Sequence, residues 1–227
     1  MSEERARKIK LMLFDVDGVM TDGTIFLFPA PGGGEVCAGG TEASAGKPGQ
    51  ARLSTDQQRE RMAAHGGFGI AGGGVIEAKG FNAHDGTGFS LARLGGLKTG
   101  LITKRITETV ALRARDLKVD HVYQGRQDKT AALHDILEKE KLTAAEVCFV
   151  GDDIIDLPVM RLCGLAIAVK NARQEVLREA HYVTPHEGGH GAVRDAIEYV
   201  LRAQGSLERV MAEYIQSRSV DPGAQVR

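Results

Sequence analysis

The sequence has few cysteines, no excess of either charge and no long apolar run. Its three cysteines (Cys37, Cys148 and Cys163) are an odd number without metal-ligand spacing, which argues against a disulfide framework. Basic and acidic residues number 29 and 30, so net charge does not favour nucleic-acid binding. No apolar stretch approaches the roughly 20 residues that span a bilayer, and the charged start MSEERARKIK is unlike a signal peptide. We therefore expect a cytoplasmic protein that binds neither nucleic acid nor a membrane.

Strand and helix patterns alternate along the chain, which predicts an α/β fold with a doubly wound parallel sheet of Rossmann-like type. We expect a single domain over residues 1–204 and a tail over 205–227 that includes a short helix. Residues 29–74 are rich in glycine and lack apolar periodicity, and this composition predicts a disordered insert. Helices are expected over 87–94, 106–117, 130–141, 157–162, 174–180 and 192–203.

The segment LMLFDVDGVMTD is the most informative in the chain, because an apolar strand pattern ends in two aspartates spaced two apart. On an extended segment, Asp15 and Asp17 point into one pocket while Val16 points back into the protein. At an effective dielectric near 20, like charges about 4 Å apart repel by roughly 4 kcal/mol, so the pair requires a cation, a shared proton or much solvent. Asp15 could then attack phosphorus while Asp17 transfers protons. An Asp-rich turn after a buried strand is the structural alternative.

Three later segments supply further groups for phosphate and metal. The apolar run in GLITKR ends at Thr103, which places a hydroxyl donor at a strand end. Asp128 is the expected N-cap of an amphipathic helix, and Lys129 brings a cation to the helix N-terminus, where phosphate is often held. VCFVGDD is a second strand pattern followed by acids, with Asp156 shortly after. Since each group follows a predicted parallel strand, we expect them together at the carboxyl edge of the sheet.

This order of groups resembles the haloacid dehalogenase superfamily of phosphatases. Its four motifs are DxD, a Ser or Thr, a Lys, and a terminal acidic motif of the GDD type, and the chain offers all four. By that resemblance, Asp15 is the nucleophile and Asp17 the general acid and base. Thr103 and Lys129 would bind the phosphoryl group.

The resemblance also implies a cofactor and a reaction. Mg²⁺ would be held by Asp15, the backbone carbonyl of Asp17 and Asp152, with Asp153 or Asp156 in support. The implied reaction is a two-step hydrolysis of a phosphomonoester through an aspartyl-phosphate.

A closer resemblance covers most of residues 11–204. The phrases DVDGVMTDG, KGFNAHDGTG, HVYQGRQDK, VGDDIIDLPVM and GGHGAVRDA are similar to the 3-deoxy-D-manno-octulosonate 8-phosphate phosphatases of lipopolysaccharide synthesis. That family has a β-hairpin flap and no large cap domain, and four subunits assemble. The resemblance therefore implies flap strands near 24–28 and 75–80, a homotetramer, and a small sugar-acid phosphate as substrate.

The second motif departs from the family at Lys104, where a glycine is usual. Arg105 matches the family and suits a sugar-acid carboxylate, because a guanidinium binds carboxylates in a bidentate fork. Relatives that act on a nine-carbon sugar acid tend to carry Glu at that place, so Arg105 favours the eight-carbon substrate. The insert is a second departure.

Three alternatives stay open at this stage. The chain could be a phosphatase for another sugar-acid phosphate or a catalytically inert assembly scaffold of the same fold. A receiver-type signalling module also combines acids, Thr and Lys on an α/β fold. Its phosphoacceptor aspartate ends a strand between the acid pair and the Thr, and outside the insert nothing acidic of that sort lies there.

Overall fold

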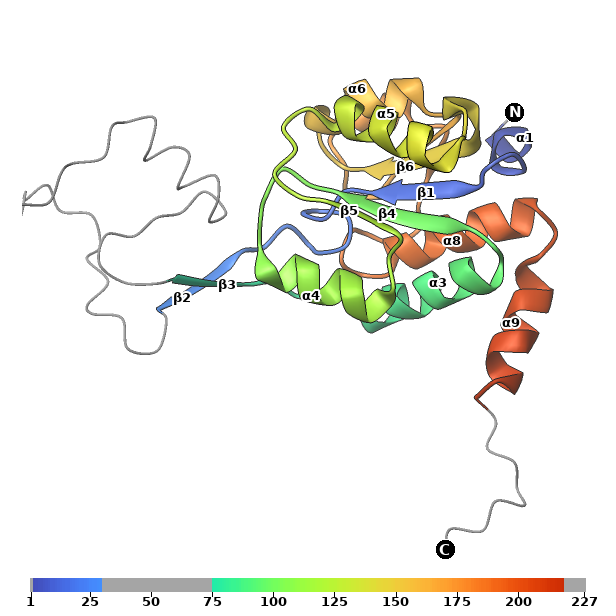
Figure 1. Ribbon diagram of the computed structural model, residues 1–227, viewed down its shortest axis with the longest axis horizontal. Coiled ribbons are helices and arrows are strands. Elements are labelled where there is room, and N and C mark those ends of the chain that lie inside the picture. The colour runs from blue at the N-terminus through green and yellow to red at the C-terminus, as the bar shows by residue number, and fades with distance from the viewer. Residues whose placement is uncertain (1, 30–74, 219–227) are drawn as a thin grey trace, which may run out of the picture.

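The computed structural model describes residues 2–29 and 75–218, so the predicted insert and the end of the tail lie outside the described residues. A six-stranded parallel sheet in the order β5-β4-β1-β6-β7-β8 forms the centre of the molecule (Figure 1). Its strands are β1 (Leu11–Phe14), β4 (Lys98–Ile102), β5 (His121–Tyr123), β6 (Val147–Gly151), β7 (Leu165–Ala168) and β8 (Tyr182–Val183). This order confirms the doubly wound fold expected from the sequence.

Helices cover both faces of the sheet (Figure 1). On one face lie α3 (Ala83–Leu94), α4 (Glu108–Leu117) and α8 (Ala192–Ala203), and on the other lie α5 (Lys129–Glu140) and α6 (Leu157–Leu162). The remaining helical segments are α1 (Ser2–Ala6), α7 (Gln174–Glu179), α9 (Leu207–Gln216) and the 3-10 turns η1 (Ala144–Glu146) and η2 (Ile154–Asp156). Among the described residues, no helix is both long and apolar enough to cross a bilayer.

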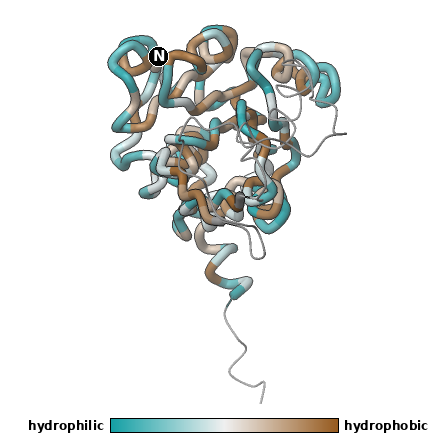
Figure 2. Tube along the Cα trace, turned by 90° about the vertical axis from the view of Figure 1, so that its left-hand side faces the viewer, coloured by the Kyte–Doolittle hydropathy of each residue, from teal (hydrophilic) through white to brown (hydrophobic). Residues whose placement is uncertain are grey.

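The inner strands are hydrophobic on both sides, as expected for a parallel sheet between two helix layers. Every residue of β1, β6 and β7 is buried. Hydrophobic and hydrophilic stretches alternate along the trace (Figure 2), as expected where helices bury an apolar side and expose a polar one. Phe14, at the end of β1, packs against Phe89 of α3 with ring centroids 5.3 Å apart. This contact fixes the end of β1, from which the next residue, Asp15, emerges.

The two ends of the predicted insert are joined by a two-stranded flap. Strands β2 (Phe26–Pro29) and β3 (Val75–Ala78) pair antiparallel, with Phe26 opposite Ala78. They lie apart from the six-stranded sheet (Figure 1). About half of each of four large apolar side chains is exposed on this flap: Phe26, Leu27, Phe28 and Ile76. The flap strands therefore form near the predicted ranges and present an apolar surface.

Two helices begin at residues other than those predicted from the apolar periodicity of the sequence, because capping residues fix where they start. Asn82 accepts a hydrogen bond from the backbone N–H of His84, so α3 begins at Ala83, before the predicted residue 87. Thr107 accepts from the N–H of Val110, so α4 begins after it. Helix α1 was not predicted from the sequence. In the tail, α9 packs on its own chain through the buried side chains of Leu207 and Val210.

Candidate active site

The candidate site lies where the order of strands reverses. β1 pairs with β4 on one side and with β6 on the other, and a doubly wound sheet opens a crevice at the carboxyl end of such a strand. Asp15 is the first residue after β1, and its backbone N–H donates to the carbonyl of Val150 in β6. Its side chain is only 6% exposed. The fold thus delivers a buried carboxylate into the crevice.

Lys129 supplies the counter-charge to Asp15. It is the first residue of α5, whose N-cap Asp128 accepts from the backbone N–H groups of Thr130 and Ala131, as expected. The Lys129 ammonium lies 2.8 Å from Asp15 Oδ1 and 2.6 Å from Asp156 Oδ1. Burial lowers the pKa of Lys129, but the two carboxylates outweigh it and raise the pKa above its usual value. The lysine therefore stays charged.

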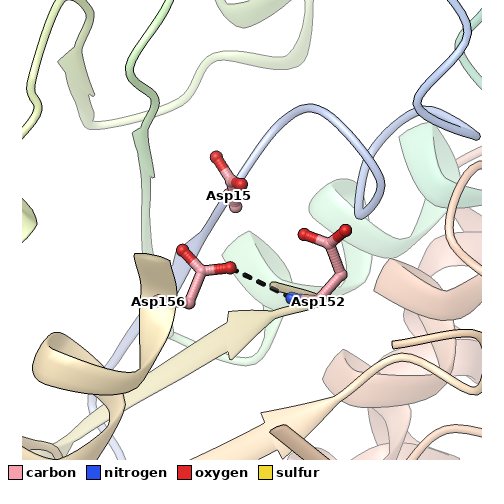
Figure 3. A group of neighbouring side chains, drawn as sticks. All are labelled: Asp15, Asp152 and Asp156. Atoms are coloured by element: carbon pink, nitrogen blue, oxygen red, sulfur yellow. Dashed lines mark hydrogen bonds between the residues drawn. The ribbon is translucent and has the colours of Figure 1, made fainter. Parts of the chain in front are cut away.

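Three carboxylates surround one space at this edge (Figure 3). Oxygens of Asp15, Asp152 and Asp156 all lie within 4.8 Å of one another. Asp156 is fully buried, and its Oδ2 accepts from the backbone N–H of Asp152 at 3.0 Å. Asp153 instead caps the turn η2 by accepting from the N–H of Ile154. Of the two supporting acids considered from the sequence, the structure places Asp156 in the cluster.

The electrostatics of this cluster fit a divalent cation. Burial, opposed by Lys129 and reinforced by Asp156, raises the pKa of Asp15 to about 7. Burial and the neighbouring carboxylates raise the pKa of Asp152 to about 8. Asp152 Oδ1 is buried and has no hydrogen-bond partner. Oxygen-rich, negatively charged sites of this kind suit a hard divalent cation, which would relieve both the repulsion and the unpaired oxygen.

Gly18 is required where the loop after β1 passes the acidic cluster. Its φ of +89° lies in the left-handed region, and a Cβ there would stand 2.2 Å from Asp152 Oδ2. The loop is also packed from its other side by the segment before α8, because the N–H of Gly189 donates to the carbonyl of Val19 at 3.0 Å. The chain between these contacts is therefore held close to the carboxylates.

Thr103 and Arg105 approach the same edge from β4. Thr103 follows the last residue of the strand, is 1% exposed, and accepts from the N–H of Arg105 at 3.3 Å. Between them, Lys104 is exposed. Arg105 directs its guanidinium to Asp17, with Nε 3.4 Å from Oδ2. The structure thus brings the second motif to Asp17.

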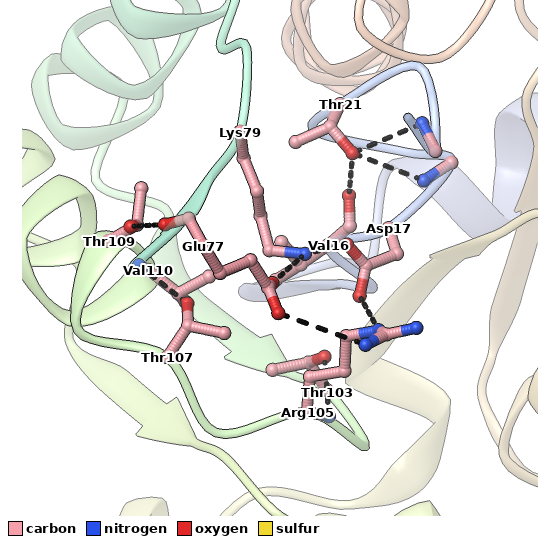
Figure 4. Close-up of polar contacts among 12 residues, drawn as sticks. Val16, Asp17, Thr21, Glu77, Lys79, Thr103, Arg105, Thr107, Thr109 and Val110 are labelled. Carbon is pink, nitrogen blue, oxygen red and sulfur yellow. Dashed lines mark hydrogen bonds and ion pairs between the residues drawn. The ribbon is translucent and has the colours of Figure 1, made fainter. Parts of the chain in front are cut away.

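Asp17 is held by groups that the motif analysis missed (Figure 4). The Lys79 ammonium, on a fully buried side chain, pairs with Asp17 Oδ1 and lies 2.8 Å from Glu77 Oε1. Arg105 Nη1 lies 3.8 Å from the other Glu77 oxygen. Glu77 lies on the flap strand β3, and Lys79 is the first residue after the end of that strand. Their spacing of two along a strand pattern places both side chains on one face, a signal that could have marked them.

A family model described as haloacid dehalogenase-like hydrolase matches residues 102–197. A 3-deoxy-D-manno-octulosonate 8-phosphate phosphatase of Yersinia pestis is 33% identical over 205 residues, covering 90% of this chain and 86% of the relative. A solved structure of that phosphatase from Yersinia pestis superposes with a TM-score of 0.69 at 33% identity, covering 91% of this chain and 88% of the other. The Moraxella catarrhalis phosphatase of the same name, solved with a magnesium ion, a phosphate ion and KDO, gives 0.70 at 27% identity, with 93% and 97% covered.

Proposed function

Because the chain belongs to the 3-deoxy-D-manno-octulosonate 8-phosphate phosphatase family of haloacid dehalogenase-like hydrolases, it is a phosphatase, and we propose that it releases phosphate from 3-deoxy-D-manno-octulosonate 8-phosphate. The observation that carries the proposal is the buried cluster at the end of β1, where Asp15 pairs with Lys129 beside the unpartnered oxygen of Asp152. Membership of this family sets aside the alternative that the chain is a receiver-type signalling module. Lipopolysaccharide precursor synthesis stays a prediction of the family resemblance, and a cytoplasmic location stays a prediction from the apolar patterning and the charged start of the sequence.

In the first proposed step, a carboxylate oxygen of Asp15 attacks phosphorus and forms an acyl phosphate. The bond from phosphorus to the sugar oxygen breaks, and Asp17 gives its proton to that oxygen. Lys129 and Thr103 bind the phosphoryl oxygens. In such transfers, catalysis rests on positioning and on neutralising charge, and the buried Lys129 supplies both at the nucleophile.

In the second step, Asp17 takes a proton from water while the water oxygen attacks the same phosphorus. The bond between phosphorus and the Asp15 oxygen then breaks, which releases phosphate and restores both carboxyl groups. The same residue serves as acid and then as base, so it must reach both the sugar oxygen and the water.

Mg²⁺ is the proposed cofactor. Asp15, the backbone carbonyl of Asp17 and Asp152 would hold it, and Asp156 supports the site through the Asp152 backbone. When bound, such an ion neutralises charge on the transferring phosphoryl group. The raised pKa values of Asp15 and Asp152 and the unpaired Asp152 oxygen support this choice. The Moraxella catarrhalis phosphatase was solved with magnesium.

Arg105 is the proposed contact for the substrate carboxylate. Its guanidinium lies among carboxylates near the mouth of the site and is 29% exposed on the side chain, so it is accessible to a sugar acid. A bidentate pair with the 2-keto acid carboxylate would distinguish sugar acids from neutral sugar phosphates.

The homotetramer is proposed from family resemblance. The half-exposed apolar side chains of the flap, such as Phe26 and Phe28, support it, because contiguous exposed apolar surface commonly marks a protein interface. Light scattering of the purified chain would give four times the subunit mass, whereas a monomeric mass at micromolar concentration would contradict the assembly.

The test of function is phosphate release from 3-deoxy-D-manno-octulosonate 8-phosphate with Mg²⁺ and with EDTA. The nine-carbon 9-phosphate analogue and neutral sugar phosphates run beside it. We expect magnesium-dependent preference for the eight-carbon acid. Equal activity on the other esters would support the phosphatase mechanism but contradict the proposed substrate. No activity on any ester would favour the alternative of a catalytically inert scaffold.

A further inference from the structure

A network of four charges joins the flap to the loop after β1, and the proposed reaction uses Asp17 and Arg105 of this network but neither Lys79 nor Glu77. Lys79 and Arg105 bracket the Asp17 carboxylate, one on each oxygen, and both also face Glu77 (Figure 4). The side chain of Lys79 is fully buried and that of Glu77 is 12% exposed. Two cations and two anions balance, which allows such a network to persist at low exposure.

The two cations hold Asp17 unequally. Lys79 makes the shorter contact from a buried position, whereas Arg105 lies 3.4 Å from Oδ2 and is 29% exposed. A substrate carboxylate can draw Arg105 away, because both ligands compete for one guanidinium fork. Oδ2 of Asp17 can then take up a proton from solvent and give it to the sugar oxygen in the first step, while Oδ1 stays fixed by Lys79.

The position of Lys79 is set by the body of the domain. The Thr109 hydroxyl, in α4, donates to the backbone carbonyl of Glu77 at 2.9 Å, which ties the base of β3 to that helix. Glu77 Oε1 in turn fixes the Lys79 ammonium. The lysine is therefore anchored from two sides, as an element that orients another side chain requires.

We propose that Lys79, oriented by Glu77, is the positioning residue that holds the Asp17 carboxylate by Oδ1 for proton transfer. This inference rests on the proposed function. Lys79 touches Asp17 and acts on the reaction only through it. General acid–base catalysis typically contributes about 10²–10⁴-fold, and misplacement by about 1 Å can cost about 10²-fold. Loss of Lys79 should thus lower kcat strongly and leave KM little changed.

The experiment is a double-mutant cycle on phosphate release, using Lys79→Met and Asp17→Asn singly and together. We expect Lys79→Met to lower kcat roughly 10- to 100-fold with KM within about twofold, and to lower it no further in the Asp17→Asn background. Lys98→Met, which removes an exposed ammonium paired with Glu140, is the matched control and should keep wild-type kcat. Lys79→Gln replaces Lys79→Met in the cycle if the latter does not fold.

The cycle can fail independently of the substrate assignment, because it is run on whichever phosphate ester the wild type hydrolyses. An equal fall of kcat in both backgrounds, or wild-type kcat for Lys79→Met, would overturn the proposal. A crystal structure of Lys79→Met gives a second reading that needs no activity. We expect the Asp17 carboxylate to turn toward Arg105, and an unmoved carboxylate would contradict the role of Lys79.

Discussion

Replacing Lys129 with methionine should destabilise the fold far more than removing an exposed lysine does. The Lys129 side chain is 2% exposed and pairs with Asp15 at 2.8 Å and Asp156 at 2.6 Å. At an effective dielectric near 20, each pair of unit charges about 4 Å apart contributes roughly 4 kcal/mol, opposed by desolvation of the ammonium. Breaking such a buried pair by removing one partner typically costs about 3–5 kcal/mol. We expect a loss of this size in the free energy of unfolding of Lys129→Met.

Urea unfolding in EDTA measures this loss, with Lys139→Met as the control. Lys139 pairs with Asp135 at 2.9 Å, but its side chain is 57% exposed, so its removal should cost less than about 1 kcal/mol. Excess Mg²⁺ should raise the stability of Lys129→Met above its own value in EDTA, because a ligand at about 100 times its Kd adds about 2.7 kcal/mol to a native state that binds it. Equal losses for the two variants in EDTA would refute the assignment of Lys129 as the counter-charge of the buried acids.

Two further predictions concern the loop after β1 and the start of α8. Gly18→Ala should lose at least about 2 kcal/mol of stability and most Mg²⁺ affinity. Gly96 is the control, because its φ is similarly positive but no atom lies within 4 Å of the position of a Cβ. Gly96→Ala should therefore lose only the roughly 1–2 kcal/mol that a left-handed backbone costs a residue with a side chain. Urea unfolding and magnesium calorimetry compare them, and equal losses would contradict the close packing against Asp152. Asp85 accepts from the N–H of Arg194 at the start of α8, and burial raises its pKa to about 6. Because the native state holds this proton more tightly than the unfolded chain, the stabilisation that Asp85 contributes should fall by roughly 3 kcal/mol in all as pH rises from below its usual pKa of about 4 to above 6. Asp85→Asn should show a shallower fall of the urea midpoint over this pH range, since only Asp15 and Asp152 then contribute to it, and a slope equal to that of the wild type would count against the assignment.

The meeting of Asp15 and Lys129 was predictable from the sequence because it follows from a general rule of topology. Each lies just beyond a strand or at a helix start, and the carboxyl ends of parallel strands share one edge. The positions of these two residues at that edge do not depend on the details of side-chain packing. The same rule brings Asp152 and Thr103 to that edge, where the structure places them.

Other features of the site depend on local turns and on the placement of the flap. The sequence left Asp153 and Asp156 as equal candidates, and the 3-10 turn η2 decides between them by directing Asp156 inward. The pairing of Lys79 with Asp17 joins residues 62 apart in sequence, across the predicted insert. Periodicity marks which side chains share a strand face, but it does not say where a two-stranded flap lies on the domain.

The most direct test of the account is the rate of phosphate release by purified, folded Asp15→Asn with Mg²⁺, measured beside the wild type on the same ester. The account predicts a fall of at least about 10³-fold, because an amide at this position cannot form the acyl phosphate. The urea midpoint should show that the variant is folded. A rate within about tenfold of the wild type would contradict Asp15 as the nucleophile, and with it the proposed mechanism.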